Sequence, residues 1–158
     1  MVYDFSADNI FEMAEQMERN GARFYRNSAE NAADPSVKKL LLQIAAMEDA
    51  HEKTFVVLRA GLIGEEKKAT VFDPEGESVL YLRAMADTKV FFEKEIDVSS
   101  IQEVFKTAIL AEKESIVFYL GMKDLVPDKL GRNKLDIIIK EEMEHIRILS
   151  NELIALNK

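Results

Sequence analysis

The chain has 158 residues, of which 47% are hydrophobic, so it is long enough to form one domain with a substantial core. Its formal net charge of −8, with no clustering of lysine or arginine, argues against nucleic acids and anionic membranes as partners. The absence of cysteine excludes disulfides, thiolate metal sites, iron–sulfur clusters and cysteine nucleophiles, so any bound metal must take oxygen and nitrogen ligands.

The three prolines and six glycines fall where helices should end, and the sequence between them predicts four long helices. The first covers about residues 6–31. The second covers about residues 35–60, because Pro35 suits the first turn of a helix and Gly61 offers a C-cap. These two helices form the first predicted hairpin.

A connection of nearly 40 residues, 62–99, follows the second helix. Links between antiparallel neighbours in a bundle usually have about 2 to 8 residues, so this connection predicts a crossover that lets the second and third helices run parallel. Within it, residues 78–87 have the pattern of a short amphipathic helix, and residues 67–76 are predicted to form an exposed loop.

The third helix is predicted to begin near Ser100, where Ser100 and Glu103 form a capping box. The fourth begins between residues 128 and 133 and ends near Leu156. The predicted fold class is therefore all-α: one domain over residues 1–158, with hairpins over 6–61 and 100–157 and a crossover over 62–99.

One constellation of four residues occurs twice, with an offset of 94 residues. A glutamate is followed after seven residues by a tyrosine, after 30 by a second glutamate and after 33 by a histidine. The two copies are Glu18, Tyr25, Glu48 and His51, and then Glu112, Tyr119, Glu142 and His145. The repeat predicts two similar helical hairpins, packed about a pseudo-two-fold axis that is a natural place for two metals.

The four repeated glutamates share helix faces with apolar residues. Glu48 follows Leu41 and Ile44 on its face, as Glu142 follows Leu135. Burying four uncompensated carboxylates would cost several kcal/mol apiece, so a cationic partner is expected. Two divalent metals supply about four positive charges, and mixed carboxylate and imidazole ligands suit iron or manganese better than calcium, with zinc as a further alternative.

The two tyrosines lie two turns after the first glutamate of each copy, on the same face of the helix. Their hydroxyls are therefore placed to hydrogen-bond the carboxylates of the metal site, although an ordinary role as core tyrosines fits nearly as well. Other residues near the motifs fall on different helix faces. The acidic ones are predicted to be solvated charges, namely Asp49, Glu52, Glu114, Glu141 and Glu144, and Met47 and Met143 are predicted to be packing residues.

The doubled pattern resembles that of the ferritin-like di-iron carboxylate superfamily, most closely its rubrerythrin branch without the rubredoxin domain. The resemblance covers about four fifths of the chain and implies a ferritin-like four-helix bundle with one long crossover. It further implies that Glu48 and Glu142 bridge two irons and that each iron has a terminal carboxylate and a histidine. The terminal carboxylates are Glu18 and Glu112, and the histidine ligands are His51 and His145.

Two departures from the family pattern bear on function. Rubrerythrins usually carry another glutamate one turn after the ligand of the third helix, where this chain has Ser115. They also commonly append a four-cysteine iron domain that delivers electrons, and this sequence has no cysteine. The resemblance therefore implies that electrons come from a separate protein.

The leading functional hypothesis is a di-iron oxidoreductase in which two ferrous ions react with peroxide or dioxygen. One alternative is ferritin-like iron oxidation and storage inside a large cage, and another is a metal-free structural bundle. The rubrerythrin-like hypothesis predicts a homodimer or small homo-oligomer. Residues 1–6 contain no basic region and no apolar run, and no long apolar segment follows, so we expect a soluble cytoplasmic protein.

Overall fold

The computed structural model describes residues 7–62, 80–81, 84, 98–126 and 128–158. All regular secondary structure in these ranges is helical. The long helices are α1 (Ala7–Glu30), α2 (Pro35–Ala60), α4 (Ile101–Leu125) and α5 (Arg132–Leu156), and a short 3-10 helix, η2 (Asp128–Leu130), precedes α5. These bounds agree with the four predicted helices to within a few residues.

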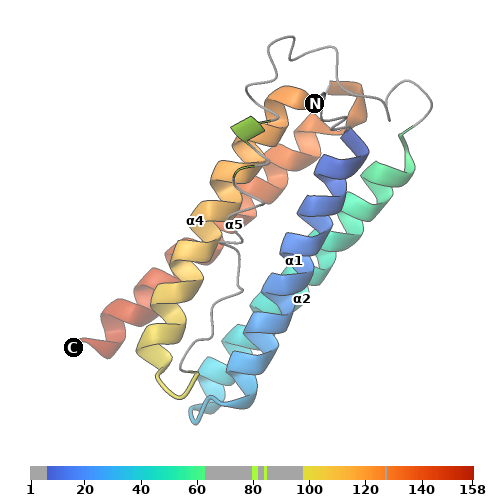
Figure 1. Cartoon of the computed structure of the whole chain (residues 1–158). Coiled ribbons are helices and arrows are strands. Elements are labelled where there is room, and N and C mark those ends of the chain that lie inside the picture. The colour runs from blue at the N-terminus through green and yellow to red at the C-terminus, as the bar shows by residue number, and fades with distance from the viewer. Residues whose placement is uncertain (1–6, 63–79, 82–83, 85–97, 127) are drawn as a thin grey trace.

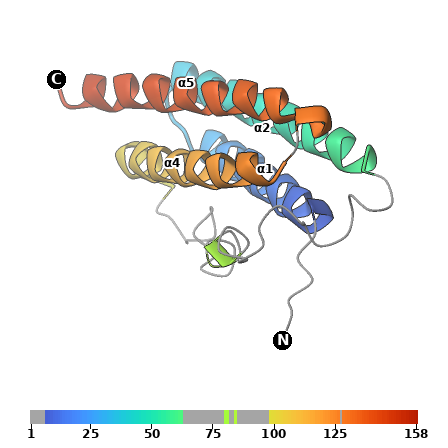
Figure 2. The same ribbon diagram turned by 90° about the horizontal axis from the view of Figure 1, so that it is seen from above.

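The four long helices form a bundle of two antiparallel hairpins, α1 with α2 and α4 with α5 (Figure 1). The helices α2 and α4 run in the same direction along the bundle, as the long connection predicted. Seen from above, α1 lies beside α4 and α2 lies beside α5 (Figure 2). The predicted all-α four-helix bundle is therefore confirmed.

Most of the predicted crossover lies outside the described residues, including the expected loop at 67–76. Three members of the short helix expected at 78–87 are described, namely Leu80, Tyr81 and Ala84, and all three are helical.

Local capping explains where the helices begin. The carboxylate of Asp34 accepts hydrogen bonds from the backbone N–H and the hydroxyl of Ser36, at 2.8 and 2.7 Å, while Pro35 occupies the first turn of α2. At the start of α4, the Ser100 hydroxyl accepts a bond of 3.4 Å from the N–H of Glu103. Short-range signals in the sequence therefore account for both boundaries.

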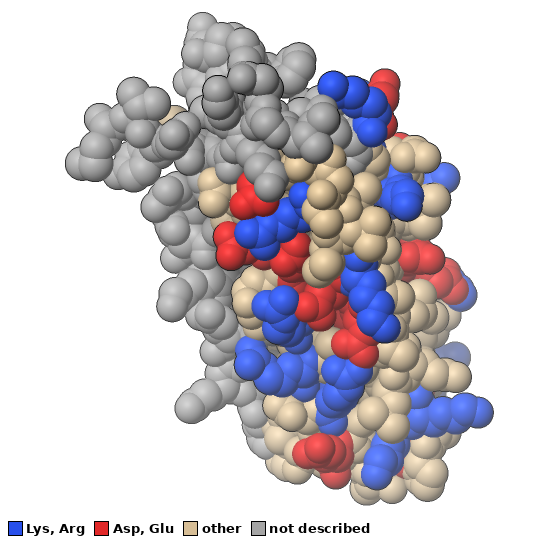
Figure 3. Space-filling view, turned by 90° about the vertical axis from the view of Figure 1, so that its right-hand side faces the viewer, with Lys and Arg blue, Asp and Glu red and all other residues tan. Residues whose placement is uncertain are grey.

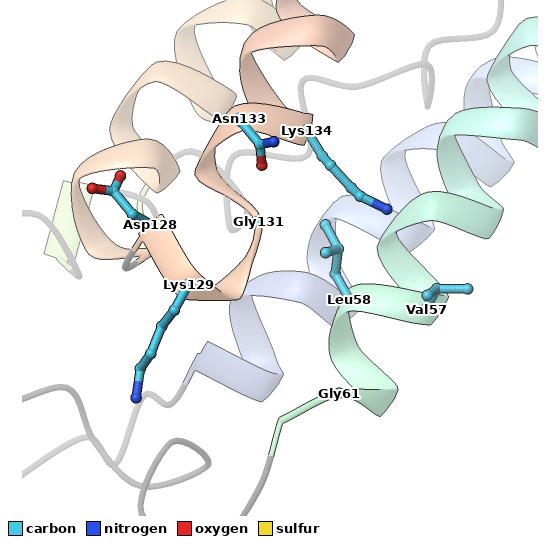
Figure 4. Close-up of a pocket in the computed structure, with 8 residues that line it drawn as sticks. All are labelled: Val57, Leu58, Gly61, Asp128, Lys129, Gly131, Asn133 and Lys134. Atoms are coloured by element: carbon cyan, nitrogen blue, oxygen red, sulfur yellow. The ribbon is translucent and has the colours of Figure 1, made fainter.

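The start of α5 depends on a glycine packed against α2. Gly131 precedes the first turn with φ of 110°, and a β-carbon added there would lie 2.5 Å from Cδ2 of Leu58. Figure 4 shows Leu58 beside Gly131 in a pocket of about 270 Å³ between the end of α2 and the start of α5. None of the eight residues that line this pocket belongs to the repeated constellation.

The apolar core consists of two clusters, one toward each end of the bundle. One contains Phe11, Phe55, Phe118 and Leu135, among others, and the second includes Leu41, Ile44, Phe105 and Leu149. Along each long helix, the glutamates and histidines of the repeated constellation fall between the two clusters, whereas Tyr25 belongs to the second cluster and Tyr119 to the first. The bundle therefore holds a polar layer between two apolar clusters.

The face formed on the side of α1 and α2 carries positive and negative side chains interspersed (Figure 3). The ion pairs that link these helices include Arg19 with Glu52 at 2.7 Å, Arg59 with Asp8 at 2.9 Å, and Arg26 with Asp49. Such exposed pairs contribute little to stability but disperse the charge. Among the described residues, no helix combines the length and apolar character needed to cross a membrane.

Candidate metal centre

The structure brings all six side chains that the sequence predicted as metal ligands into the polar layer. One comes from α1, two from α2, one from α4 and two from α5. Their exposed fractions are 1% for Glu18, 3% for Glu48, 3% for His51, 1% for Glu112, 0% for Glu142 and 0% for His145. Carboxylates buried this completely require a charge partner, and buried imidazoles require polar partners.

The six residues form two overlapping groups that can each hold a metal ion. One group is Glu18, His51, Glu48 and Glu142, and the other is Glu112, His145, Glu48 and Glu142. In each group the four ligand atoms lie within 4.8 Å of one another. The two glutamates common to both groups are those that the family resemblance implied would bridge the metals.

Both histidines direct their Nδ1 atom toward the carboxylates. Nδ1 of His51 lies 3.1 Å from Oε1 of Glu142 and 3.4 Å from Oε2 of Glu18. Nδ1 of His145 lies 3.0 Å from Oε2 of Glu142 and 3.2 Å from Oε1 of Glu48. The two rings stack with their centroids 5.9 Å apart. The imidazoles therefore approach the centre of the layer as a matched pair.

The tyrosines connect the two hairpins at this layer. The Tyr25 hydroxyl of α1 donates a hydrogen bond to Glu112 of α4, and the Tyr119 hydroxyl of α4 donates to Glu18 of α1. Burial first, and the nearby carboxylates second, raise the pKa of both tyrosines well above the usual value. The phenols therefore remain protonated donors at neutral pH, and each fixes a carboxylate of the opposite hairpin.

The carboxylates respond strongly to burial and to one another. Burial, reinforced by repulsion from neighbouring carboxylates, raises the pKa of Glu48 and that of Glu142 well above the usual range. Burial acts in the same direction on Glu112, but hydrogen bonding with Glu142, His145 and Tyr25 outweighs it and lowers the pKa of Glu112. Without metal, Glu48 and Glu142 therefore hold protons more strongly than isolated carboxyl groups do.

The histidines carry positive charge in the metal-free layer. Burial alone would lower the pKa of His51, but Glu142 and Glu18 raise it to about 12. Burial is likewise outweighed at His145, where Glu112 and Glu142 raise the pKa to about 10. Protons thus supply the positive charge that these carboxylates need when no metal is present.

Unpaired atoms in the layer fit a metal centre. Among the described residues, five buried side-chain oxygens and nitrogens make no hydrogen bond of suitable geometry, and four of them face this layer: Glu18 Oε2, Glu48 Oε1, His51 Nδ1 and Glu142 Oε1. Buried polar atoms almost always make well-formed hydrogen bonds, whereas these four only approach a charged neighbour at 3.1–3.4 Å, so their arrangement fits a site for a ligand. Their oxygen and nitrogen chemistry suits iron, manganese or zinc.

Two contacts behind the histidines were missed by the sequence prediction. Nε2 of His51 lies 2.8 Å from Oε2 of Glu141, and Nε2 of His145 lies 3.4 Å from Sδ of Met47. Glu141 is therefore more than a solvated charge, and Met47 contacts a histidine. The prediction that Met143 is a packing residue was wrong, because this side chain is 52% exposed. In the sequence, the offset of 94 residues makes Met47 and Glu141 equivalent positions of the repeat, but the side chains that they contact depend on the packing of α2 against α5.

The other acidic residues behave more nearly as predicted. Asp49, Glu52 and Glu144 each pair with an arginine on the exposed surface. Ser115 stands where rubrerythrins usually have an additional glutamate, and its hydroxyl donates a bond of 3.1 Å to the carbonyl of Ala111 in the preceding turn. This hydroxyl is thus engaged by the backbone of α4.

Comparison with known proteins agrees with the geometry. The family model described as Rubrerythrin matches residues 9–153. The chain belongs to the rubrerythrin family. This match spans both copies of the constellation, so all six candidate ligands of this rubrerythrin-family chain lie within it.

A solved structure supports the fold independently. A protein from Thermotoga maritima, described as a ferritin-like diiron-carboxylate protein, aligns with this rubrerythrin-family chain at a TM-score of 0.69 and 24% identity. The alignment covers 97% of each chain. A search of curated proteins finds no match.

Proposed function

We propose that this chain is a di-iron oxidoreductase that reduces peroxide or dioxygen. The observation that carries the proposal is the pair of overlapping, fully buried groups of glutamate and histidine that share Glu48 and Glu142. Membership of the rubrerythrin family supports iron as the metal. The oxygen and nitrogen donors also accommodate manganese or zinc, which the experiment below distinguishes.

The residues of the polar layer would divide the work of holding two metals. Glu18 and His51 would bind one ion, Glu112 and His145 the other, and the two common glutamates would bind both. When bound, ferrous iron supplies the electrons that reduce peroxide or dioxygen. The four carboxylates balance the charge of two divalent ions and stabilise the added charge of the oxidised centre.

The surrounding residues hold this layer in place and keep it dry. Tyr25 and Tyr119 fix the orientation of the terminal glutamates through hydrogen bonds from the opposite hairpin. Apolar clusters lie on both sides of the layer along the bundle, with Phe55 and Phe105 among their fully buried members. Low solvent access strengthens the interaction between the carboxylates and bound cations.

Continued turnover would require a supply of electrons from outside the chain. We propose a separate electron-donor protein, because the sequence contains no cysteine that could ligate a second iron centre. A homodimer or small homo-oligomer is the assembly that we propose for this activity. Native mass spectrometry tests it, since a cage of many subunits would favour iron storage instead.

The direct test measures metal content and reactivity in the same preparation. Protein isolated without oxygen from its natural host should contain about two irons per chain, and the reduced protein should consume peroxide with oxidation of both irons. The variant Glu48→Ala should lose the activity together with the metals. Zinc in the isolated protein, or two irons that do not react with peroxide or dioxygen, would contradict the proposal.

A further inference from the structure

The two histidines differ in what lies behind them. Nε2 of His51 is 2.8 Å from a carboxylate oxygen of Glu141, whereas Nε2 of His145 is 3.4 Å from the thioether sulfur of Met47. Met47 and Glu141 occupy equivalent places in the internal repeat, each one residue before a shared glutamate. The repeat, which conserves all six candidate ligands and both tyrosines, is broken at this pair.

The difference changes the histidines as ligands. Since Nδ1 faces the polar layer in both rings, a neutral ring that binds metal through Nδ1 carries its proton on Nε2. A carboxylate that accepts this N–H fixes the ring and makes Nδ1 a stronger donor, whereas a thioether is a weak, uncharged acceptor. His51 is therefore the better oriented and more strongly donating metal ligand of the two.

The remaining partners of the two positions are closely matched. Each terminal glutamate receives one tyrosine hydrogen bond from the opposite hairpin, and Glu48 and Glu142 belong to both groups. Both histidine side chains are nearly inaccessible, at 4% and 0% exposed. The side chain of Glu141 is 43% exposed, so its hydrogen bond to His51 lies at the rim of the bundle.

We propose that Glu141 and Met47 make the two metal positions unequal, so that the position formed with Glu18 and His51 fills first. The position formed with Glu112 and His145 fills second and releases its metal more readily. Glu141 acts as a positioning residue, through the ring of His51. Partners of this kind typically change metal affinity by about 10- to 100-fold. The inference rests on the dimetal site proposed above and adds an order of loading to it.

The chain offers a direct readout, because it contains only two histidines. Metal-free protein is titrated with Zn²⁺ in the presence of a competing chelator, and the ring C–H signals are followed by NMR after assignment with His51→Gln and His145→Gln. The signals of His51 should respond during the first equivalent and those of His145 during the second. Simultaneous response, or His145 first, overturns the proposed order. If neither ring responds to Zn²⁺, the dimetal site itself fails.

Three variants test whether Met47 and Glu141 determine the order of metal loading. Glu141→Met should weaken the His51 position by about 10-fold or more and remove the order. The exchange Met47→Glu with Glu141→Met should reverse it, which a merely structural role of Glu141 would not do. Glu144→Met is the matched control, because Glu144 carries the same charge, is 46% exposed and pairs with Arg147. An unchanged order in Glu141→Met overturns the proposal.

Discussion

The four buried glutamates do not contribute equally to the candidate metal centre. Glu48 and Glu142 belong to both ligand groups, whereas Glu18 and Glu112 belong to one each. Losing a shared carboxylate therefore removes a ligand from two metals at once. Losing a terminal carboxylate leaves the other group of four complete.

Replacing the two kinds of glutamate should consequently give different metal contents. We expect Glu48→Ala to lose stoichiometric binding of both metals and Glu18→Ala to retain about one. Elemental analysis of the purified variants measures this, with the exposed Glu30→Ala on α1 as a control that keeps both ions. Two ions in Glu48→Ala would rule out the shared role of this residue.

The tyrosine hydroxyls should stabilise the fold as well as orient the carboxylates. Tyr119→Phe removes a fully buried donor and leaves an oxygen of Glu18 without its partner. An unsatisfied buried acceptor costs about 1–3 kcal/mol, so the free energy of unfolding in urea should fall by that amount. Tyr25→Phe should behave similarly through Glu112. Tyr81→Phe provides a control at a tyrosine that is 41% exposed, and an equal loss there would contradict the assignment.

At the level of helices, the sequence predicted the ends better than the contacts between elements. Pro35 and Gly61 bound α2 because capping depends on residues close in sequence. Helical periodicity likewise placed the glutamates on the inner faces. Periodicity could not show that Glu141 contacts His51. Charged residues occur both on the solvent-facing side of a helix and at the edge of its buried face, and only the packing of α5 against α2 decides which of them contacts a histidine.

The junction of α2 and α5 gives a test at this scale. Gly131→Ala forces a residue with a β-carbon to adopt a left-handed backbone conformation. The added β-carbon would also lie 2.5 Å from Cδ2 of Leu58. Backbone strain of this kind costs about 1–3 kcal/mol, which denaturant unfolding should detect. Gly61→Ala is the matched control, since its φ is −77° and the closest atom would be 3.4 Å away. Equal destabilisation by both substitutions would contradict the explanation.

In the whole molecule, the polar layer places charged groups between two apolar clusters. Bound metals compensate that charge only in the folded state, because the ligands come from four helices that lie far apart along the unfolded chain. A ligand held at 100 times its dissociation constant stabilises the fold by about 2.7 kcal/mol. Chelation should therefore lower the melting temperature, and an unchanged melting curve after verified metal removal would contradict this account.

The same layer should make the pH dependence of stability differ between metal-free and metal-bound protein. Without metal, Glu48 and Glu142 have raised pKa values, and those of His51 and His145 are about 12 and 10. Groups that bind protons more tightly when folded contribute stability at low pH and lose it as the pH rises toward the folded pKa. From pH 6 to 9, the stability that these groups contribute to the metal-free protein therefore declines. Glu112, whose pKa is lowered, does not oppose this decline, because its carboxyl group is ionised throughout the interval.

Metal binding must expel the protons held by these groups, so its affinity should increase with pH over the same interval. The gap in melting temperature between metal-loaded and metal-free protein is therefore expected to widen from pH 6 to pH 9. Calorimetric titration in buffers of different ionisation enthalpy should also detect net proton release. Glu48→Ala, which should not bind the two metals, is expected to show no such gap in melting temperature. A gap that is constant or narrows as the pH rises would mean that protons do not hold the place of the metals in this layer.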